Sequence, residues 1–547
     1  MARSAGDFNL AVYLLVVIVE VTVVESFCKP SEACWPTSGT IAAFENSLTG
    51  SIVERGDAKY EDLVIMKNAR TTKYPTLMVL VKTTEDVQKS IRFARTHDIR
   101  ITIQSSGHDF IGRSTDDFSL QINMAEMKDV AVDLSSARHS DGEITVGSGC
   151  SWKEIYQEVD TNGRVILGGS THTVSPGGYT LGGGHSPVSR TLGLAVDNVL
   201  EFEMVDVDGN LVKSTSGGTD ITFENGTTTS NSDAELFWAL RGGGGGTFGV
   251  VTKFIFKLHQ PPSQVVKFYC GYALLAYGQV IGKNMIKTFI SLIKDLPTEW
   301  GGYFILIGSP ISSIYFGPIM FVLNHYGTMT NEHKLYLEPL YNLCADDHNF
   351  TEFDSFWKYE ETIVEEEYTW LYTFNTLMSA DDFTDDWVNF VTDQMTNPPA
   401  GSTFGCTGTL IGGKVKEIGK QETSVHPAFR STDMSLTCYV AWSYETRHLD
   451  NRYVDAAKSL GRKLQTYGRG VYVNEPAADP TNWKSDFWGD NYDKLYEIKK
   501  KWDPAGQLQC RYCVGYVESG NSADQTTFSA FWMFCEMSVI LGLTVLP

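Results

Sequence analysis

The spacing of apolar positions early in the chain predicts a strand, a helix and a second strand. The continuous apolar run 77–81 suits a buried strand, and the threonine pair 83–84 can cap a helix whose apolar positions between 87 and 94 share one face. A second short apolar run occupies 101–103. The loop QSSGHDFIGRS at 104–114 therefore follows the carboxyl end of a strand, where open α/β units place ligands.

Two further glycine-rich stretches follow this loop. Residues 168–186 read GGSTHTVSPGGYTLGGGHS, and 241–251 read RGGGGGTFGVV, between the helical pattern DAELFWAL and the alternating strand VVTKFIFKL. A single stretch of this kind is usually a turn, and the third lacks the preceding strand that a dinucleotide-binding fold requires. Three within one span predict a large phosphate-bearing ligand lying along backbone loops, because glycine lets N–H groups approach an anion closely.

Length and charge limit the class of protein. A chain of 547 residues, 42% hydrophobic and 12% aromatic, predicts a globular protein with more than one domain. Lysine and arginine total 44 against 66 aspartate and glutamate residues, which gives a formal net charge of -22. Such a charge opposes a phosphate backbone or an anionic bilayer, so we expect no nucleic-acid partner.

Both ends of the chain carry apolar segments. The first 26 residues resemble a secretory signal peptide, with a short buried helix as the alternative. Residues 528–547 are apolar and follow a small, polar stretch, which is the layout of a cleaved lipid-anchor signal. Glu536 interrupts that segment, so a packed C-terminal segment is the alternative. We expect a secreted, extracellular protein, or alternatively a lipid-anchored one on the cell surface, with membrane contact only through this tail.

Cysteines and glycosylation sequons agree with an oxidising compartment. The chain has ten cysteines and sequons at Asn225 and Asn349. Spacing leaves the disulfide pairing open. The pair Cys510 and Cys513 has no second pair or histidine at metal spacing, so we expect a disulfide or two buried thiols there and no metal site.

Four ordered motifs carry a family resemblance. IQSSGHDFIGRS, GGSTHTVSPGGYTLGGGHSPVSRTLGLAVDNVLEFEMVDVDG, LFWALRGGGGGTFGVVT and FWGDNYDKLYEIKKKWDP lie in this order. Together they resemble the FAD-linked oxidases of the berberine bridge enzyme-like group in the vanillyl-alcohol oxidase superfamily. The resemblance implies an α+β fold with a two-subdomain PCMH-type FAD-binding domain at 60–260. A substrate domain at 261–465, with an antiparallel sheet covered by helices, a berberine-bridge-like segment at 466–516 that returns to the FAD domain, and a tail at 517–547 would follow.

The resemblance also implies where FAD binds. In this family the histidine of the Ser-Gly-His loop is bonded to the flavin 8-methyl group, so His108 is the expected attachment point. This chemistry needs a neutral imidazole aimed at an electrophilic methyl group. The other residues implied along the cofactor come from several loops. They are Ser105, Ser106, Gly107, Asp109, Gly112, Ser114, Thr171, Thr173, Val174, Gly178, Gly182, Gly183, Gly184, His185, Asp197, Asn198, Val251, Asn491 and Tyr492.

One position departs from the family pattern. Many relatives carry a second covalent link through a cysteine in a G-x-C-P-T-V frame, and here the frame reads GSTHTV with Thr171 at the cysteine position. Threonine cannot form a thioether, and Cys150 lies outside the frame as an expected small buried residue. We therefore expect FAD with a single covalent link, through His108.

The resemblance also implies the catalytic residues, because the catalytic segment of this family precedes the last motif. The segment holds Tyr472, Asn474 and Glu475, followed by Pro476. Removing a hydroxyl proton while hydride leaves the adjacent carbon needs an acceptor within hydrogen-bond reach, so Glu475 either acts as general base or orients Tyr472. A plain turn residue before the proline is the alternative.

The substrate domain gives weaker indications. The aromatic stretches 300–304 and 368–374 are typical of sheet core, with stacking on a sugar or arene as the alternative, and the acidic run 365–367 is typical of a solvated face.

Val174 is relevant to which molecule accepts the electrons of the reduced flavin. In the family it borders the flavin face that dioxygen approaches, and a compact side chain there goes with oxidases. We therefore predict hydride transfer from a small organic substrate, such as an alcohol, sugar hemiacetal, phenolic compound or alkaloid, to FAD, with O2 converted to H2O2. A flavin-binding scaffold without turnover and a dehydrogenase with another acceptor are the alternatives.

Overall fold

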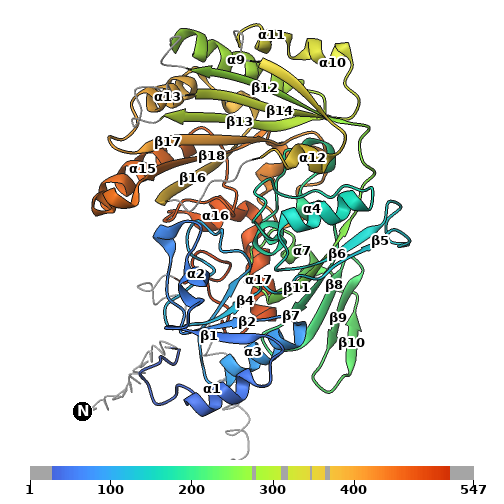
Figure 1. The fold of residues 1–547 in the computed structure, drawn as a ribbon, viewed down its shortest axis with the longest axis vertical. Coiled ribbons are helices and arrows are strands. Elements are labelled where there is room, and N and C mark those ends of the chain that lie inside the picture. Colours follow the sequence, from blue (N-terminus) through green and yellow to red (C-terminus); the bar gives the residue numbers. More distant parts are fainter. Residues whose placement is uncertain (1–26, 274–278, 309–317, 345–347, 364–369, 518–547) are drawn as a thin grey trace, which may run out of the picture. The chain divides into compact units, whose positions relative to one another are not determined.

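The computed structural model describes residues 27–273, 279–308, 318–344, 348–363 and 370–517 (Figure 1). The expected signal peptide, the C-terminal tail from residue 518 and the acidic run lie outside these residues. Cys28–Tyr516 contains all three sheets. None of the helices in the described part of the chain combines the length and apolar character needed to cross a membrane.

The first sheet contains the predicted strand, helix and strand. Its order is β1-β2-β4-β3, with β2 and β3 both parallel to β4 and β1 antiparallel to β2. The strands are β1 (Ser51–Glu54), β2 (Leu77–Leu80), β3 (Ile101–Gln104) and β4 (Leu120–Asn123). Between β2 and β3, α3 (Thr84–Thr96) begins after the N-cap Thr83, whose side chain accepts a hydrogen bond from the Asp86 backbone. The prediction for this unit is confirmed, and the loop 105–114 does follow a strand that ends at Gln104.

The second sheet is antiparallel and follows the order β10-β9-β8-β7-β11-β6-β5. Its strands are β5 (Val130–Asp133), β6 (Glu143–Gly147), β7 (Val199–Val205), β8 (Leu211–Thr215), β9 (Gly218–Thr222), β10 (Thr228–Asn231) and β11 (Val250–Lys257). The helices α4 (Trp152–Thr161), α7 (Glu235–Leu240) and α17 (Tyr492–Trp502) share its hydrophobic core. The C-terminal segment therefore packs against residues more than 200 positions earlier in the chain.

The third sheet is also antiparallel and follows the order β15-β12-β14-β13-β17-β18-β16. Its strands are β12 (Val265–Ala273), β13 (Trp300–Gly308), β14 (Pro318–Tyr326), β15 (His348–Phe353), β16 (Trp370–Met378), β17 (Thr403–Leu410) and β18 (Met434–Trp442). Figure 1 shows α9 (Gln279–Lys294) and α13 (Asp385–Thr396) on one side of it, and their apolar side chains join its core. The predicted α+β fold class is confirmed.

The aromatic stretch of β13 divides between the two faces of this sheet. Trp300 and Phe304 are buried in the core, as predicted for sheet residues, whereas Tyr303 between them remains partly accessible. Because side chains alternate along a strand, Tyr303 points to the face opposite Phe304.

Disulfides join four pairs of cysteines: Cys28–Cys34, Cys270–Cys344, Cys406–Cys438 and Cys510–Cys513. Cys150 is a free, buried thiol in the described part of the chain, and burial raises its pKa to about 11. This thiol stays protonated at neutral pH, as expected of a packing residue.

Candidate functional site

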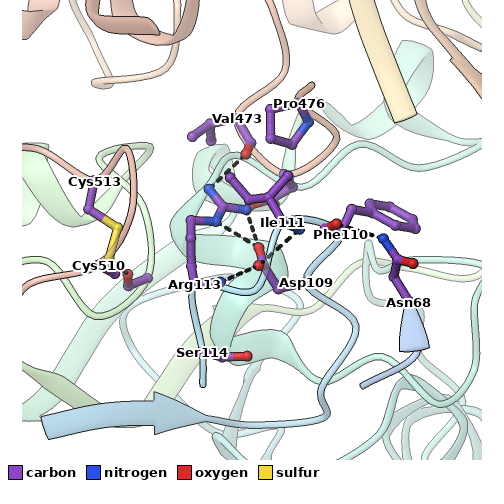
Figure 2. A network of polar contacts seen from close by, with 12 residues as sticks. Asn68, Asp109, Phe110, Ile111, Arg113, Ser114, Val473, Pro476, Cys510 and Cys513 are labelled. Atoms are coloured by element: carbon purple, nitrogen blue, oxygen red, sulfur yellow. Dashed lines mark hydrogen bonds and ion pairs between the residues drawn. A yellow bond between two sulfur atoms is a disulfide. The ribbon is translucent and has the colours of Figure 1, made fainter. Parts of the chain in front are cut away.

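The loop after β3 is fixed by its own side chains and by the C-terminal segment. The Asp109 carboxylate accepts hydrogen bonds from the backbone N–H groups of Ile111 and Arg113, at 3.2 and 2.6 Å. The Arg113 guanidinium bonds the same carboxylate at 2.6 Å and donates to the Val473 carbonyl oxygen at 2.9 Å (Figure 2). Asn68 donates to the Phe110 carbonyl at 2.8 Å from the other side of the loop. The loop is therefore held from both ends of the chain.

The three glycine-rich stretches meet, as predicted. The Ser106 hydroxyl accepts a hydrogen bond from the Ser175 N–H at 3.1 Å, which joins the first stretch to the second. A Cβ at Gly177 would lie 2.2 Å from Ser105 Oγ, so glycine permits this approach. A Cβ at Gly245 would lie 3.7 Å from Gly178 Cα, which brings the third stretch beside the second.

Where these stretches meet, the chemistry fits a dinucleotide. The backbone N–H groups of Ser106, Gly107 and Asp109 have no acceptor among the described residues, so they remain donors for an anion. Gly107 and Gly112 adopt φ of 71° and 79°, in the left-handed region that favours glycine. Gly178 is exposed, and a Cβ there would meet nothing within 4 Å. The loops therefore offer both space and donors to a pyrophosphate.

His108 lies against the second stretch. Its Nε2 is 2.9 Å from Thr173 Oγ1, so the imidazole is held beside the frame that contains Thr171. Thr171 and Thr173 are exposed, and Val174 is partly accessible. The structure thus groups the expected attachment residue with three of the residues implied to line the flavin.

The expected catalytic residues lie next to the second stretch. The Tyr472 hydroxyl accepts hydrogen bonds from the Gly184 N–H at 3.1 Å and from Asn474 Nδ2 at 2.8 Å. Asn474 also donates to the Tyr179 carbonyl at 3.0 Å, and a Cβ at Gly182 would lie 2.1 Å from its Oδ1. Tyr472 and Asn474 are therefore packed directly on the glycines implied to bind FAD.

Glu475 bonds to His185 and Thr437 and not to the Tyr472 hydroxyl, and its role as general base stays a prediction. Its Oε1 is 3.0 Å from His185 Nε2, and its other oxygen accepts a hydrogen bond from the Thr437 hydroxyl. The Tyr472 hydroxyl, by contrast, is bonded to Gly184 and Asn474, so these two groups orient it. Burial acts to raise the pKa of Glu475, but the charge and hydrogen bond of His185 and the bond from Thr437 outweigh burial and lower the pKa. Glu475 is therefore a carboxylate at neutral pH.

Several residues implied along the cofactor have side chains occupied elsewhere. The Asp197 carboxylate forms a buried ion pair with Arg430 at 2.8 Å, and Asn198 donates to two nearby carbonyl groups at 2.9 Å. Asn491 donates to the Val425 carbonyl at 2.9 Å, and Tyr492 packs on two tryptophans. Val251 and Ser114 use their backbone instead: the Val251 carbonyl accepts a hydrogen bond from Ser148, and the Ser114 carbonyl accepts one from Gln121 at 3.1 Å. Cofactor contact by all the implied residues, these six included, stays a prediction.

A second carboxyl group was not anticipated from the sequence. Glu360, at the end of α12 (Phe356–Glu360), is 0% exposed and accepts a hydrogen bond from Ser170 Oγ at 3.1 Å. Ser170 in turn accepts one from the Tyr303 hydroxyl at 2.6 Å, and His172 Nε2 lies 4.0 Å from the carboxyl group. Burial raises the pKa of Glu360 to about 8, so this group is a neutral acid at pH 7. The one sequence feature that could have pointed to this buried carboxyl group was His172, which stands at the proline position of the family frame.

Both carboxyl groups lie near the same two tyrosines. Glu475 keeps 22% of its side-chain surface accessible, and Tyr179 and Tyr303 are also partly accessible, whereas Glu360 is fully buried. Burial raises the pKa of both tyrosines, and the carboxyls of Glu360 and Glu475 contribute to each shift. These tyrosines are therefore close enough to both carboxyls to be affected by each.

Comparisons with known proteins agree with this geometry. Residues 75–215 match a family described as "FAD binding domain", and residues 471–508 match one described as "Berberine and berberine like". The FAD-linked oxidoreductase ZEB1 of Gibberella zeae is 26% identical, over 87% of this chain and 90% of that protein.

Solved structures are similar as well. The VAO-type flavoprotein MtVAO615 from Myceliophthora thermophila C1 superposes with a TM-score of 0.74 at 26% identity, covering 89% of this chain and 97% of that one. A glucooligosaccharide oxidase from Acremonium strictum, described as carrying 6-S-cysteinyl, 8α-N1-histidyl FAD, gives a TM-score of 0.71 at 19% identity. It covers 87% of this chain and 99% of its own, and at this identity it supports the fold alone.

Proposed function

We propose that this chain, which belongs to the berberine bridge enzyme-like FAD-linked oxidoreductases, is an oxidase that removes a proton and a hydride from a small organic alcohol or related compound. FAD, when bound, supplies the hydride acceptor. The observation that carries the proposal is a partly accessible carboxylate, Glu475, that bonds to His185 beside the glycines of the flavin loops.

Glu475 is the proposed general base. The lowered pKa keeps Glu475 ionised at neutral pH, so its oxygens can accept the proton of a substrate hydroxyl, and His185 and Thr437 hold the carboxylate in place. Tyr472, fixed by Gly184 and Asn474, orients the substrate.

His108 is the proposed covalent attachment residue. The contact between His108 Nε2 and Thr173 Oγ1 supports this role, because it fixes the ring beside the loop that is implied to follow the flavin. Threonine at 171 supports a single link.

Oxygen is the proposed acceptor of the electrons. Val174 is partly accessible, and its backbone is fixed by hydrogen bonds with Trp152 at 3.0 Å and Thr171 at 3.1 Å. A small side chain at a fixed position leaves space for O2, which one added methylene would fill.

A secreted location, or alternatively a lipid-anchored one at the cell surface, is part of the proposal. Four disulfides and exposed sequon residues at Asn225 and Asn349 support an oxidising, glycosylating compartment. Expression in a eukaryotic secretory host tests this: the mature chain should begin near residue 27 and lose mass on treatment with an N-glycosidase.

A substrate panel tests the activity. Sugars, phenolic alcohols and alkaloids are incubated with the purified flavoprotein, and H2O2 release is measured. At least one class should release H2O2, and Glu475→Gln should abolish the release while flavin content is unchanged. Glu361→Gln is the matched control, because Glu361 is an exposed carboxylate paired with Lys358 at 2.9 Å. Flavin reduction by no member of the panel, or full activity in Glu475→Gln, would contradict the proposal.

A further inference from the structure

Three side chains, one of them Ser170 of the flavin-loop frame, form a directional hydrogen-bond chain. The Tyr303 hydroxyl donates to Ser170 Oγ at 2.6 Å, and Ser170 Oγ donates to Glu360 Oε1 at 3.1 Å. Glu360 is fully buried, so it ends the chain inside the protein and cannot itself reach a ligand. Tyr303 is partly accessible and is the end of the chain that a ligand can reach.

The direction of these hydrogen bonds determines whether Tyr303 can donate to a ligand or accept from it. A hydroxyl has one proton and two acceptor lone pairs. Ser170 uses its proton toward Glu360, and Tyr303 uses its proton toward Ser170. The Tyr303 oxygen therefore retains only acceptor capacity.

Two other partly accessible polar groups have the same character. The Tyr179 hydroxyl donates its proton to the His185 carbonyl at 2.6 Å, so its oxygen is also left as an acceptor. Glu475, as a carboxylate, only accepts. Tyr303, Tyr179 and Glu475 thus present acceptors at separate points.

We propose that Tyr303 is a specificity-determining residue that accepts a hydrogen bond from a second O–H or N–H group of the substrate, with Ser170 and Glu360 as positioning residues. The inference rests on the proposed function only for placing the substrate beside Glu475 and Tyr303. The substrate class is narrowed to compounds with at least two hydrogen-bond donors. Ethers and esters that lack the second donor are discriminated against, because they leave the acceptor unpaired.

Two small probes test the binding without turnover. Resorcinol and 3-methoxyphenol differ by one donor, and neither has an alcohol carbon from which hydride can leave. Isothermal titration calorimetry on the flavin-loaded protein should give resorcinol a dissociation constant about threefold to tenfold lower, which is the net effect of one hydrogen bond. Equal affinities, including no binding of either probe, or tighter binding of 3-methoxyphenol, overturn the proposal.

Variants test whether the preference for resorcinol arises from the hydrogen bonds of Tyr303. Tyr303→Phe should make the two dissociation constants equal. Tyr359→Phe is the matched control, because the Tyr359 hydroxyl is buried and has no hydrogen-bond partner in the described part of the protein, so the preference should persist. A preference that survives in Tyr303→Phe contradicts the assignment.

Ser170 and Glu360 are tested by their effect on the same preference for resorcinol over 3-methoxyphenol. Ser170→Ala releases the Tyr303 proton, so Tyr303 can donate to the ether oxygen and the preference should fall or reverse. Glu360→Gln keeps an amide oxygen for Ser170 and should retain the preference, whereas Glu360→Leu should lose it. An unchanged preference in Ser170→Ala and Glu360→Leu would show that they do not position Tyr303. Because these are binding measurements, the inference can fail while H2O2 release succeeds, and the reverse.

Discussion

Glu360→Gln should make the protein more stable, increasingly so as the pH rises from 5 to 8. The side chain is 0% exposed and its pKa in the folded protein is about 8, against 4.5 for an ordinary glutamate. Because the folded pKa is the higher one, the carboxyl contributes its full stability below pH 4.5 and loses that contribution as the pH rises through about 8.

The size of the effect follows from the interval between the two pKa values. At pH 7 the unfolded carboxyl is ionised and must take up a proton on burial, across about 2.5 pH units at 1.36 kcal/mol each, or about 3 kcal/mol. Glutamine avoids this cost, and its amide oxygen can still accept the hydrogen bond from Ser170. For a chain of this length, about 3 kcal/mol corresponds to roughly 3 °C in unfolding midpoint if the chain unfolds as one unit.

Differential scanning calorimetry of samples with matched flavin content measures this effect. Wild type, Glu360→Gln and the exposed control Glu361→Gln are scanned at one rate from pH 5 to pH 8.5. The midpoint of Glu360→Gln should equal that of wild type near pH 5 and exceed it progressively above, while the control stays parallel to wild type. A difference that does not vary with pH, or a less stable glutamine variant at pH 8, would refute the argument that Glu360 is buried as a neutral acid.

Three further changes test the flavin loops and the candidate catalytic carboxylate. Arg113→Met removes the bonds to Asp109 and Val473 and should lower the ratio of flavin to protein absorbance at least twofold, so an unchanged ratio counts against this anchoring role. Glu475→Gln should reduce the rate of anaerobic flavin reduction by a substrate from the panel about 100-fold, and a rate within a factor of two of wild type rejects it as the base. Val174→Leu should slow reoxidation of the photoreduced protein by O2 about tenfold in stopped flow, with unchanged flavin content, and equal rates remove the proposed oxygen path.

Local patterns made the first sheet and the flavin loops predictable. The strand, cap and helix face between Leu77 and Ala94 depend on neighbours within a few residues, and the glycines at 107 and 112 mark turns that other residues avoid. Family resemblance identified Tyr472, Asn474 and Glu475 as catalytic candidates, and the structure adds that Tyr472 and Asn474 pack directly on the second glycine-rich stretch.

Contacts between distant segments were not predictable. Glu360 stands in an acidic, aromatic segment that is typical of a solvated helix, and its burial, which makes it a neutral acid, depends on packing with distant segments such as that of Ser170, 190 positions earlier. The ion pair of Asp197 with Arg430 spans 233 positions and gives no local signal. Sequence patterns indicate which face of a single helix or strand is exposed. The environments of Glu360 and Asp197 form only when distant segments pack together.

The site of flavin attachment tests the central claim most directly. The purified protein is denatured in acid, the precipitate is washed, and its tryptic peptides are analysed by mass spectrometry beside those of His108→Ala. We predict that the wild-type precipitate stays yellow, with one FAD on the peptide that contains His108, and that the variant releases its flavin into the wash. Flavin that washes out of the wild type, or that is attached through a cysteine, would contradict the account.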